Sequence, residues 1–274
     1  MTVSADTFTF VVDLVRRRTA IELTADKEYL VETRLLPLAR LAGLAGVDEY
    51  VSTLRTGGQG AEHDRLVEAL TTNETSWFRD VGPFEAITGH VLPALVASRP
   101  ELRSLRIWSA ACSTGQEPYS IVMALLDAAP DLVVRVTATD ISQEVLERGR
   151  AGRYSQLEIN RGLPAGMLVR HFAREGTEWQ VSDQVRSKVT FSRHNLLDRP
   201  PPGGPFDIVL LRNVLIYFDL ESRAKVLRSV RGDLRPDGFL FLGAVETTLG
   251  IDSVWERVSV GRGSVYRLKK AEAA

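Results

Sequence analysis

The sequence has little of what several common classes of protein require. Cys112 is the single cysteine among 274 residues, which excludes an internal disulfide framework and favours a reducing compartment. No apolar run approaches the ~20 residues that a membrane-spanning helix needs. The arginines near the N-terminus follow the apolar stretch, which is the reverse of a secretory signal. The formal net charge of -1 argues against a protein held on nucleic acid by phosphate contacts. We expect a cytoplasmic protein with no nucleic-acid partner and no membrane insertion.

Motifs of other nucleotide-dependent enzymes are also missing. There is no GxxxxGK[ST], which argues against a P-loop nucleotidase, and no GxGxxG, which argues against a nicotinamide or flavin enzyme. The histidines show no spacing typical of metal ligands, so we predict no metal site; they are His63, His90, His171 and His194. Cys112 has no histidine motif beside it and is interpreted as a small packing residue.

Hydrophobic periodicity divides the chain into two regions. Residues 8–72 show helical spacing and predict a helical domain over residues 1–80, with a linker to about residue 97. From residue 98 to 274, strand-like and helix-like segments alternate, as in an α/β fold with a parallel sheet. The strand candidates are residues 105–111, 132–139, 206–211 and 238–243, and the helix candidates between them are 118–128, 143–150 and 220–234. The alternating pattern on both sides of residues 261–263 predicts a terminal antiparallel hairpin.

The alternation of strands and helices breaks between about residues 152 and 192. A turn at residues 175–178 lies between strand-like runs at 168–172 and 179–181, and another such run covers 188–191. We predict a small antiparallel β insertion here, and insertions of this kind often carry partner recognition.

The most informative stretch is LRIWSAACSTGQEPYS, residues 105–120. An apolar run leads into small residues, including Ala110 and Gly115, and then into Glu117 and a helical pattern. A strand that ends in a tight turn and opens a helix is where an α/β sheet binds its ligand. The next strand ends in Asp140, where nucleoside sites place a carboxylate on ribose hydroxyls. The pair indicates a nucleoside-cofactor site. The alternative for Glu117 is a capping acid that interacts favourably with the helix dipole, and the alternative for Asp140 is an N-cap of the following helix.

Polar residues elsewhere could complete such a site. Arg79, in TTNETSWFRD, could clamp a ligand carboxylate or merely pair with an acid. Arg212, Asn213 and Tyr217 follow a strand candidate, where substrate contacts concentrate; the alternative for Tyr217 is a half-buried core aromatic. Asn195 and Leu196 follow the strand-like run VTFSRH, residues 189–194, and could contact an adenine.

Six ordered motifs together resemble one family along nearly the full chain, the chemotaxis receptor glutamate methyltransferases, or CheR family. The motifs are TTNETSWFRD, RIWSAACSTGQEPYS, ATDISQEVLERGRAGRY, NLLD, FDIVLLRNVLIYFD and RPDGFLFLGAVET. The resemblance implies a Rossmann-like, S-adenosylmethionine-dependent methyltransferase sheet. It also implies an N-terminal helical domain and a small antiparallel β subdomain.

The resemblance also implies a role for each matching position. Asn73, Thr75 and Arg79 would contact the methionyl end of S-adenosylmethionine and the active centre. Glu117 would meet the amino group of the cofactor, Asp140 its ribose, and Asn195 with the Leu196 backbone its adenine. The remaining residues predicted to line the cofactor site are Ala110, Gly115, Ile141, Arg212 and Asn213. Arg79 and Tyr217 are the predicted catalytic residues, which would orient the acceptor.

The implied reaction is methyl transfer to glutamate side chains of chemotaxis receptors, giving methyl esters and S-adenosylhomocysteine for sensory adaptation. The implied partner is the cytoplasmic helical region of these membrane receptors. The turn at residues 174–179 is short, which favours an enzyme independent of a receptor C-terminal peptide. Two alternatives stay open: a methyltransferase acting on another carboxylate, and a non-catalytic scaffold that senses the cofactor.

Overall fold

The chain divides into two compact units. The computed structural model describes residues 3–57, 60–261 and 263–269. The first unit extends to Thr72 and includes Tyr217–Ser222, and the second comprises Asn73–Ile216 and the chain from Arg223 onward. The predicted boundary was residue 80. In the structure, the stretch 73–80 belongs to the sheet-containing unit and not to the helical one. None of the helices in the described ranges has the length and apolar character needed to cross a bilayer.

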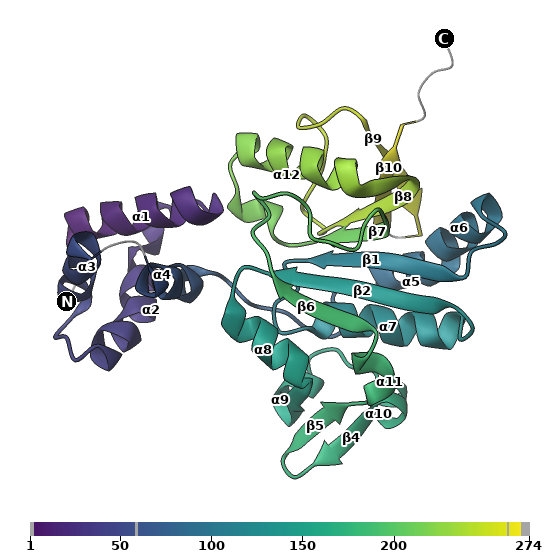
Figure 1. Cartoon of the computed structure of the whole chain (residues 1–274), viewed down its shortest axis with the longest axis horizontal. Coiled ribbons are helices and arrows are strands. Elements are labelled where there is room, and N and C mark those ends of the chain that lie inside the picture. Colours follow the sequence, from purple (N-terminus) through teal and green to yellow (C-terminus); the bar gives the residue numbers. More distant parts are fainter. Residues whose placement is uncertain (1–2, 58–59, 262, 270–274) are drawn as a thin grey trace. The chain divides into compact units, whose positions relative to one another are not determined.

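The first unit is helical, as predicted. Its helices are α1 (Ala5–Thr19), α2 (Glu28–Leu41), α3 (Val47–Thr56) and α4 (Ala61–Leu70), with a 3-10 turn η1 (Ala25–Lys27) before α2 (Figure 1). Ser4 caps α1 by accepting a hydrogen bond from the Thr7 N–H. The apolar faces of the four helices form one core, in which Val11, Leu35 and Leu66 are fully buried. The segment 217–222 joins this unit through the Glu22 N–H, which donates to the Tyr217 carbonyl at 2.9 Å.

The second unit is built on a mostly parallel sheet of seven strands, which confirms the predicted fold class. The strand order is β6-β2-β1-β7-β8-β10-β9, and β10 runs antiparallel to both of its neighbours, β8 and β9. The strands are β1 (Ser104–Ala110), β2 (Val133–Asp140), β6 (Val189–Arg193), β7 (Phe206–Leu211), β8 (Leu234–Leu242), β9 (Trp255–Val260) and β10 (Gly263–Leu268). Every residue of β7 is buried, because helices cover both faces of a parallel sheet. The hairpin β9–β10 is the predicted terminal hairpin, and Arg262 in its turn lies outside the described residues.

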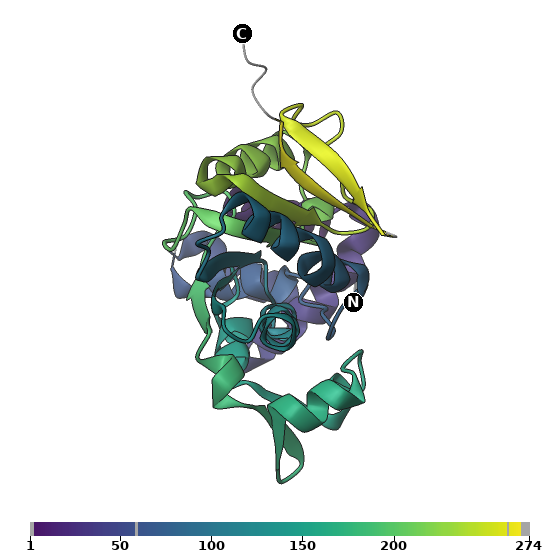
Figure 2. The same cartoon turned by 90° about the vertical axis from the view of Figure 1, so that its right-hand side faces the viewer.

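Helices pack on both faces of this sheet. A continuous helical stretch runs through α5 (Gly82–Ala86), a π-helical turn η2 (Ile87–Val91) and α6 (Leu92–Ser98), and it packs beside α7 (Gln116–Ala128). The helix α12 (Leu220–Asp233) covers the opposite face (Figures 1 and 2). The helix α8 (Gln143–Ala151) packs on β2 and β6.

The insertion is an antiparallel sheet of three strands, in the order β3-β5-β4. Its elements are β3 (Arg153–Ser155), α9 (Gln156–Ile159), α10 (Ala165–His171), β4 (Phe172–Glu175), β5 (Glu178–Val181) and α11 (Asp183–Arg186). Two details of the prediction were wrong. Residues 168–171 are helical, and the run 188–191 belongs to β6 of the main sheet, where it pairs in parallel with β2. An apolar run shows that a strand is buried, but not which partner it pairs with.

The order of the strands creates a switch point beside β1. The chain passes from β1 to β2 and β6 on one side, and then returns to place β7 on the other side of β1. The carboxyl ends of β1 and β7 therefore lie side by side, with connections that leave in opposite directions. This is the position where open α/β sheets bind ligands.

Candidate active site

The turn after β1 adopts a backbone conformation that few residues tolerate. Ala111, Ser113 and Gly115 all have positive φ angles, of 58°, 49° and 94°. A Cβ atom on Gly115 would lie 3.1 Å from the Phe191 ring and 3.2 Å from the Gly149 Cα, so only glycine fits there. Such strained backbone clusters at ligand sites and is held by its surroundings.

Asp140 ends β2 beside this turn and is buried. Its Oδ2 accepts the Ser113 N–H at 2.9 Å, and its Oδ1 accepts the Ser142 N–H at 3.1 Å. A carboxylate has about four lone-pair sites and accepts hydrogen bonds from hydroxyl groups as well as from main-chain N–H groups. The N-cap alternative for Asp140 is wrong, because Ser142 caps α8 by accepting from the Val145 N–H.

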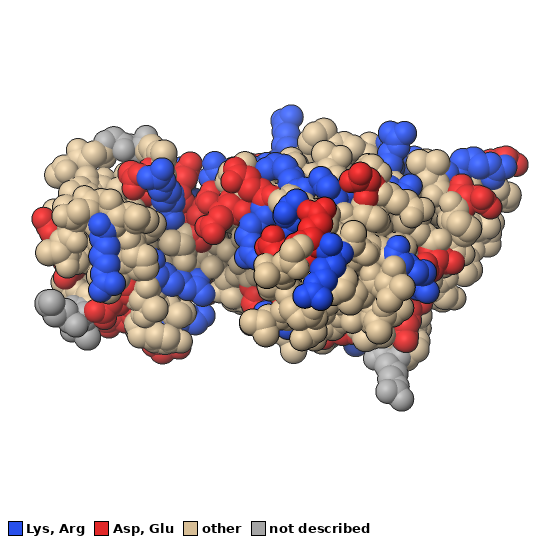
Figure 3. Space-filling view, turned by 90° about the horizontal axis from the view of Figure 1, so that it is seen from below, with Lys and Arg blue, Asp and Glu red and all other residues tan. Residues whose placement is uncertain are grey.

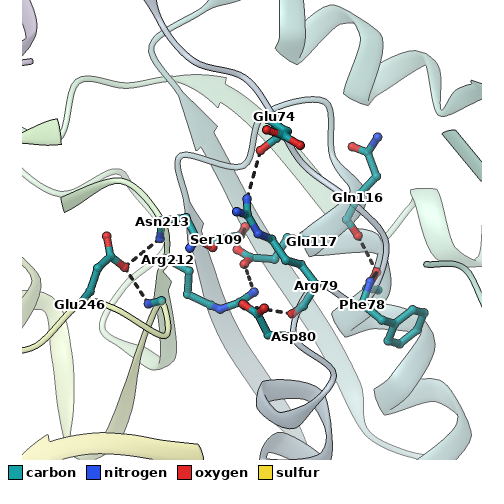
Figure 4. Close-up of polar contacts among 12 residues, drawn as sticks. Glu74, Phe78, Arg79, Asp80, Ser109, Gln116, Glu117, Arg212, Asn213 and Glu246 are labelled. Atoms are coloured by element: carbon teal, nitrogen blue, oxygen red, sulfur yellow. Dashed lines mark hydrogen bonds and ion pairs between the residues drawn. The ribbon is translucent and has the colours of Figure 1, made fainter. Parts of the chain in front are cut away.

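Glu117 and Arg212 form an ion pair across the switch point (Figure 4). Arg212 Nη1 lies 2.9 Å from Glu117 Oε2, and Ser109 Oγ donates to Glu117 Oε1 at 2.7 Å. The Arg212 side chain is only 1% exposed, and its Nη2 donates to Asp80 Oδ2 at 2.8 Å and to the Arg79 carbonyl at 2.9 Å. One buried guanidinium thus connects the ends of β1 and β7 to the segment 79–80.

The side chain of Trp77 and the main chain of Phe78 anchor the segment that carries Asn73, Thr75 and Arg79. Trp77 is buried and packs edge-to-face against Tyr154, with ring centroids 4.8 Å apart, while the Phe78 N–H donates to Ser120 Oγ. The Asn73 carbonyl accepts from Ser113 Oγ at 2.7 Å, which ties the segment to the turn after β1. Arg79 is half-exposed, and its Nη1 donates to the Glu74 carbonyl at 3.2 Å. The guanidinium keeps further N–H donors for a ligand.

The remaining predicted residues lie at four places. Ala110 is buried at the end of β1, and Ile141 follows β2, where its carbonyl accepts from Arg193 Nε. Asn195 and the buried Leu196 follow β6; Asn195 Oδ1 accepts the Leu197 N–H at 3.1 Å. Tyr217 belongs to the first unit.

Two acids of this edge were missed by the sequence analysis, Asp80 and Glu246. Asp80 bonds to Arg212, as described above, and Glu246 is 8% exposed and accepts main-chain N–H groups of the turn that follows β7. The quoted motifs contain both acids, but no spacing rule singles them out, because Arg212 lies 132 positions from Asp80 and Val214 lies 32 positions from Glu246.

The buried groups around the turn do not resemble a nucleophile or a metal site. Burial raises the pKa of the Cys112 thiol well above its usual value, and the Asp140 carboxylate adds to this shift. The thiol is therefore protonated at neutral pH, as suits a packing residue. Within the described ranges, no group of three His, Cys, Asp or Glu side chains could hold a metal ion.

Comparison with known families identifies the family of the chain. The family model of the CheR methyltransferase SAM-binding domain matches residues 73–262, and that of the CheR methyltransferase all-alpha domain matches residues 6–71. The chain belongs to the CheR methyltransferase family. It is a methyltransferase that uses S-adenosylmethionine, and the match to the SAM-binding domain includes every predicted cofactor residue.

Curated relatives cover nearly the whole chain. Chemotaxis protein methyltransferase 1 of Pseudomonas aeruginosa is 41% identical over 256 residues, covering 91% of this chain and 93% of its own. Cher2 of Pseudomonas putida is 40% identical with the same coverage, and the chemotaxis protein methyltransferase of Salmonella typhimurium is 36% identical over 275 residues, 97% of this chain and 91% of that protein. Among solved structures, a DhpI–SAH complex aligns with a TM-score of 0.33 and 18% identity over 71% of this chain and 72% of that one.

Proposed function

We propose that this CheR methyltransferase methylates glutamate side-chain carboxylates of chemotaxis receptors, giving glutamate methyl esters and S-adenosylhomocysteine. The observation that carries this proposal is the match to chemotaxis protein methyltransferases over 91% of the chain. The polar residues at the carboxyl ends of β1, β2 and β7 support the proposal, because they suit the polar groups of S-adenosylmethionine.

Each polar group of the cofactor has a suited residue at this edge. Glu117 offers a carboxylate to the ammonium group, and Asp140 offers a carboxylate to the ribose hydroxyls. Asn73, Thr75 and Arg79 are assigned to the methionyl end of the cofactor and to the active centre. Asn195 and the Leu196 main chain are assigned to the adenine, while Ala110, Gly115, Ile141, Arg212 and Asn213 line the site. When bound, S-adenosylmethionine supplies a methyl group on a positively charged sulfur.

The acceptor needs no general base. A glutamate near its reference pKa of ~4.3 is already anionic at neutral pH and can attack the methyl carbon directly. The enzyme then has to hold the carboxylate oxygen in line with the methyl group and the sulfur, and such orientation can supply several kcal/mol. Arg79 would hold the acceptor carboxylate through its free N–H donors, and Tyr217 would border the acceptor.

The proposed partner is the cytoplasmic helical region of membrane chemoreceptors, which places the enzyme in the cytoplasm. On the face that carries the insertion, basic and acidic side chains are intermingled (Figure 3). Several of them form local pairs, such as Arg148–Glu158 and Arg153–Glu175. The hairpin β4–β5 has a turn of two residues between Glu175 and Glu178, and we propose that the enzyme works without a receptor C-terminal peptide. Measurable binding of such a peptide to the purified protein would contradict this.

A methanol-release assay tests the proposal. The protein is incubated with methyl-labelled S-adenosylmethionine and receptor-bearing membranes from its own source, and alkali then releases esterified methyl groups as volatile methanol. We expect base-labile label that Arg79→Ala nearly abolishes, and a lower turnover with nearly unchanged cofactor affinity for Tyr217→Phe. Arg103→Ala is the matched control, because the Arg103 side chain is 75% exposed and pairs only with exposed Glu101. Clear S-adenosylhomocysteine binding without any label would point instead to another carboxylate acceptor or to a cofactor-sensing scaffold.

A further inference from the structure

The Glu246 carboxylate collects an unusual number of main-chain donors. Its Oε2 accepts the Gly243 N–H at 2.6 Å and the Asn213 N–H at 2.8 Å (Figure 4). Its Oε1 accepts the Val214 N–H at 2.9 Å and the Ile216 N–H at 3.3 Å. The side chain is 8% exposed, so these bonds form in a largely dry environment, where they are strong.

These donors have no partner in the sheet. The pairing of β7 with β8 ends at Leu211 and Leu242, and the amides of residues 213, 214 and 216 lie beyond it. Buried main-chain N–H groups must be paired, and a carboxylate with about four lone-pair sites can satisfy several at once. The fit is close, because a Cβ atom on Gly243 would lie only 2.7 Å from Glu246 Oε2.

The turn held in this way separates two residues of the proposed mechanism. It begins directly after Arg212, whose buried guanidinium pairs with Glu117 and Asp80. It ends at Ile216, directly before Tyr217 in the chain. Within the turn, Asn213 has a φ of 58°, a left-handed conformation that needs support from its surroundings.

We propose that Glu246 is a positioning residue for methyl transfer. It fixes the main chain from Asn213 to Ile216 and thereby sets the direction of the Arg212 side chain. It contacts neither reactant itself. This inference rests on the proposed function for its effect on turnover, but its effect on the turn is independent of the acceptor.

Glu246→Gln is the variant that tests the inference. Glutamine keeps the shape of the side chain but presents an NH₂ group to N–H donors, so half of the acceptor capacity is lost. We expect kcat in the methanol-release assay to fall about 10-fold or more, while the KM for S-adenosylmethionine changes by less than about 3-fold, since Ser109 still holds Glu117. We also expect hydrogen–deuterium exchange of the amides at residues 213–216 to accelerate at least about 10-fold.

Glu256→Gln is the matched control, because it removes the same charge from a half-exposed side chain paired with Arg267 on the terminal hairpin. It should leave both the kcat and the exchange of the turn unchanged. If Glu246→Gln does not fold, kcat and amide exchange are measured on Glu246→Asp instead. Aspartate keeps both carboxylate oxygens but is too short to reach every donor, so the same two changes are expected.

Three results would overturn the inference. The first is unchanged amide exchange in the turn. The second is a lower Tm with an unchanged kcat at a temperature where the variant is folded, which would indicate a purely stabilising role. The third is an increase in KM that accounts for the whole loss of activity. If the wild-type protein releases no methanol, the proposed function fails, and the amide exchange alone decides whether Glu246 holds the turn.

Discussion

Arg212 and Glu117 lie 95 positions apart in the chain, yet their side chains meet at 2.9 Å where β1 and β7 end. The two residues leave neighbouring strands at the switch point of the sheet, and the guanidinium is fully enclosed. Breaking a buried pair of this kind leaves an uncompensated charge, so its geometry should be sensitive to small changes.

Arg212→Lys tests this sensitivity, because lysine keeps the charge but loses the planar fork. Its ammonium cannot satisfy Glu117, Asp80 and the Arg79 carbonyl together. We expect the free energy of unfolding to fall by roughly 1.5–3 kcal/mol for each charged hydrogen bond lost. Urea denaturation measures this, with Arg267→Lys as control; its exposed pair with Glu256 should contribute less than about 1 kcal/mol. Equal losses in the two variants would contradict the prediction.

Asp140→Asn should weaken cofactor binding. The amide keeps the size of the side chain but removes the charge and one acceptor oxygen, and a hydrogen bond to a charged group contributes roughly 1.5–3 kcal/mol. We therefore expect the affinity for S-adenosylhomocysteine, measured by calorimetry, to fall about 10-fold or more. Asp131→Asn is the control, because Asp131 is exposed just before β2. An affinity equal to that of the wild type would remove Asp140 from the cofactor site.

Gly115→Ala should destabilise the turn after β1. A side chain at φ +94° is strained, and the new methyl group would press on Phe191 and Gly149. The expected loss is about 1–3 kcal/mol of unfolding free energy, together with weaker cofactor binding. Gly232→Ala provides a contrast, because a Cβ there meets nothing within 4 Å and its helical position favours alanine by up to about 1 kcal/mol. Denaturation curves that shift the same way in both variants would refute the argument.

Two histidines, the buried His171 and the half-buried His194, predict that mild acid destabilises the protein. Burial lowers the pKa of His171, although Asp127 opposes the shift, and burial lowers the pKa of His194 as well. Below about pH 6.5 the unfolded chain then binds more protons than the folded one, so stability rises with pH through this range and is lost as pH falls. The free energy of unfolding should decrease between pH 7.5 and 5.5.

The double variant His171→Gln, His194→Gln should show a smaller decrease over the same range. Carboxyl groups whose pKa is lowered, such as those of Asp48 and Asp219, titrate at more acidic pH and do not contribute to the change in stability over this range. Denaturant curves at the two pH values measure the effect, and identical pH dependence in the variant and the wild type would count against it.

Sequence patterns were sufficient to predict those elements in which the environment restricts the residue type at each position. The fully apolar run of β7 and the turn at Gly115 could be predicted, because burial on both faces and a positive φ each restrict the residue type at every position. The motif resemblance then led to the family. The run 188–191 was assigned to the wrong sheet, since parallel pairing with β2 depends on a tertiary contact that no local pattern encodes.

The candidate site was predictable only in part, for the same reason. Asp140 and Glu117 directly follow strand and turn signals, so their position at the edge could be read from the chain. Glu246 accepts hydrogen bonds from main-chain amides of another segment. Almost every residue type has a main-chain N–H, so the sequence does not show which residues donate to Glu246. Asp80 was missed because its partner, Arg212, is 132 positions away.

The division of the chain has a practical consequence for anyone who would study the sheet-containing unit alone. The polypeptide passes between the two units at residues 72–73, 216–217 and 222–223, so a single cut cannot separate them. A fragment beginning at Asn73 would retain Tyr217–Ser222 without the residues of the first unit that pair with this segment, among them Ile21 and Glu22. Phe218, which is 5% exposed in the whole protein, would then face solvent beside the start of α12. The protein is therefore best produced as one chain.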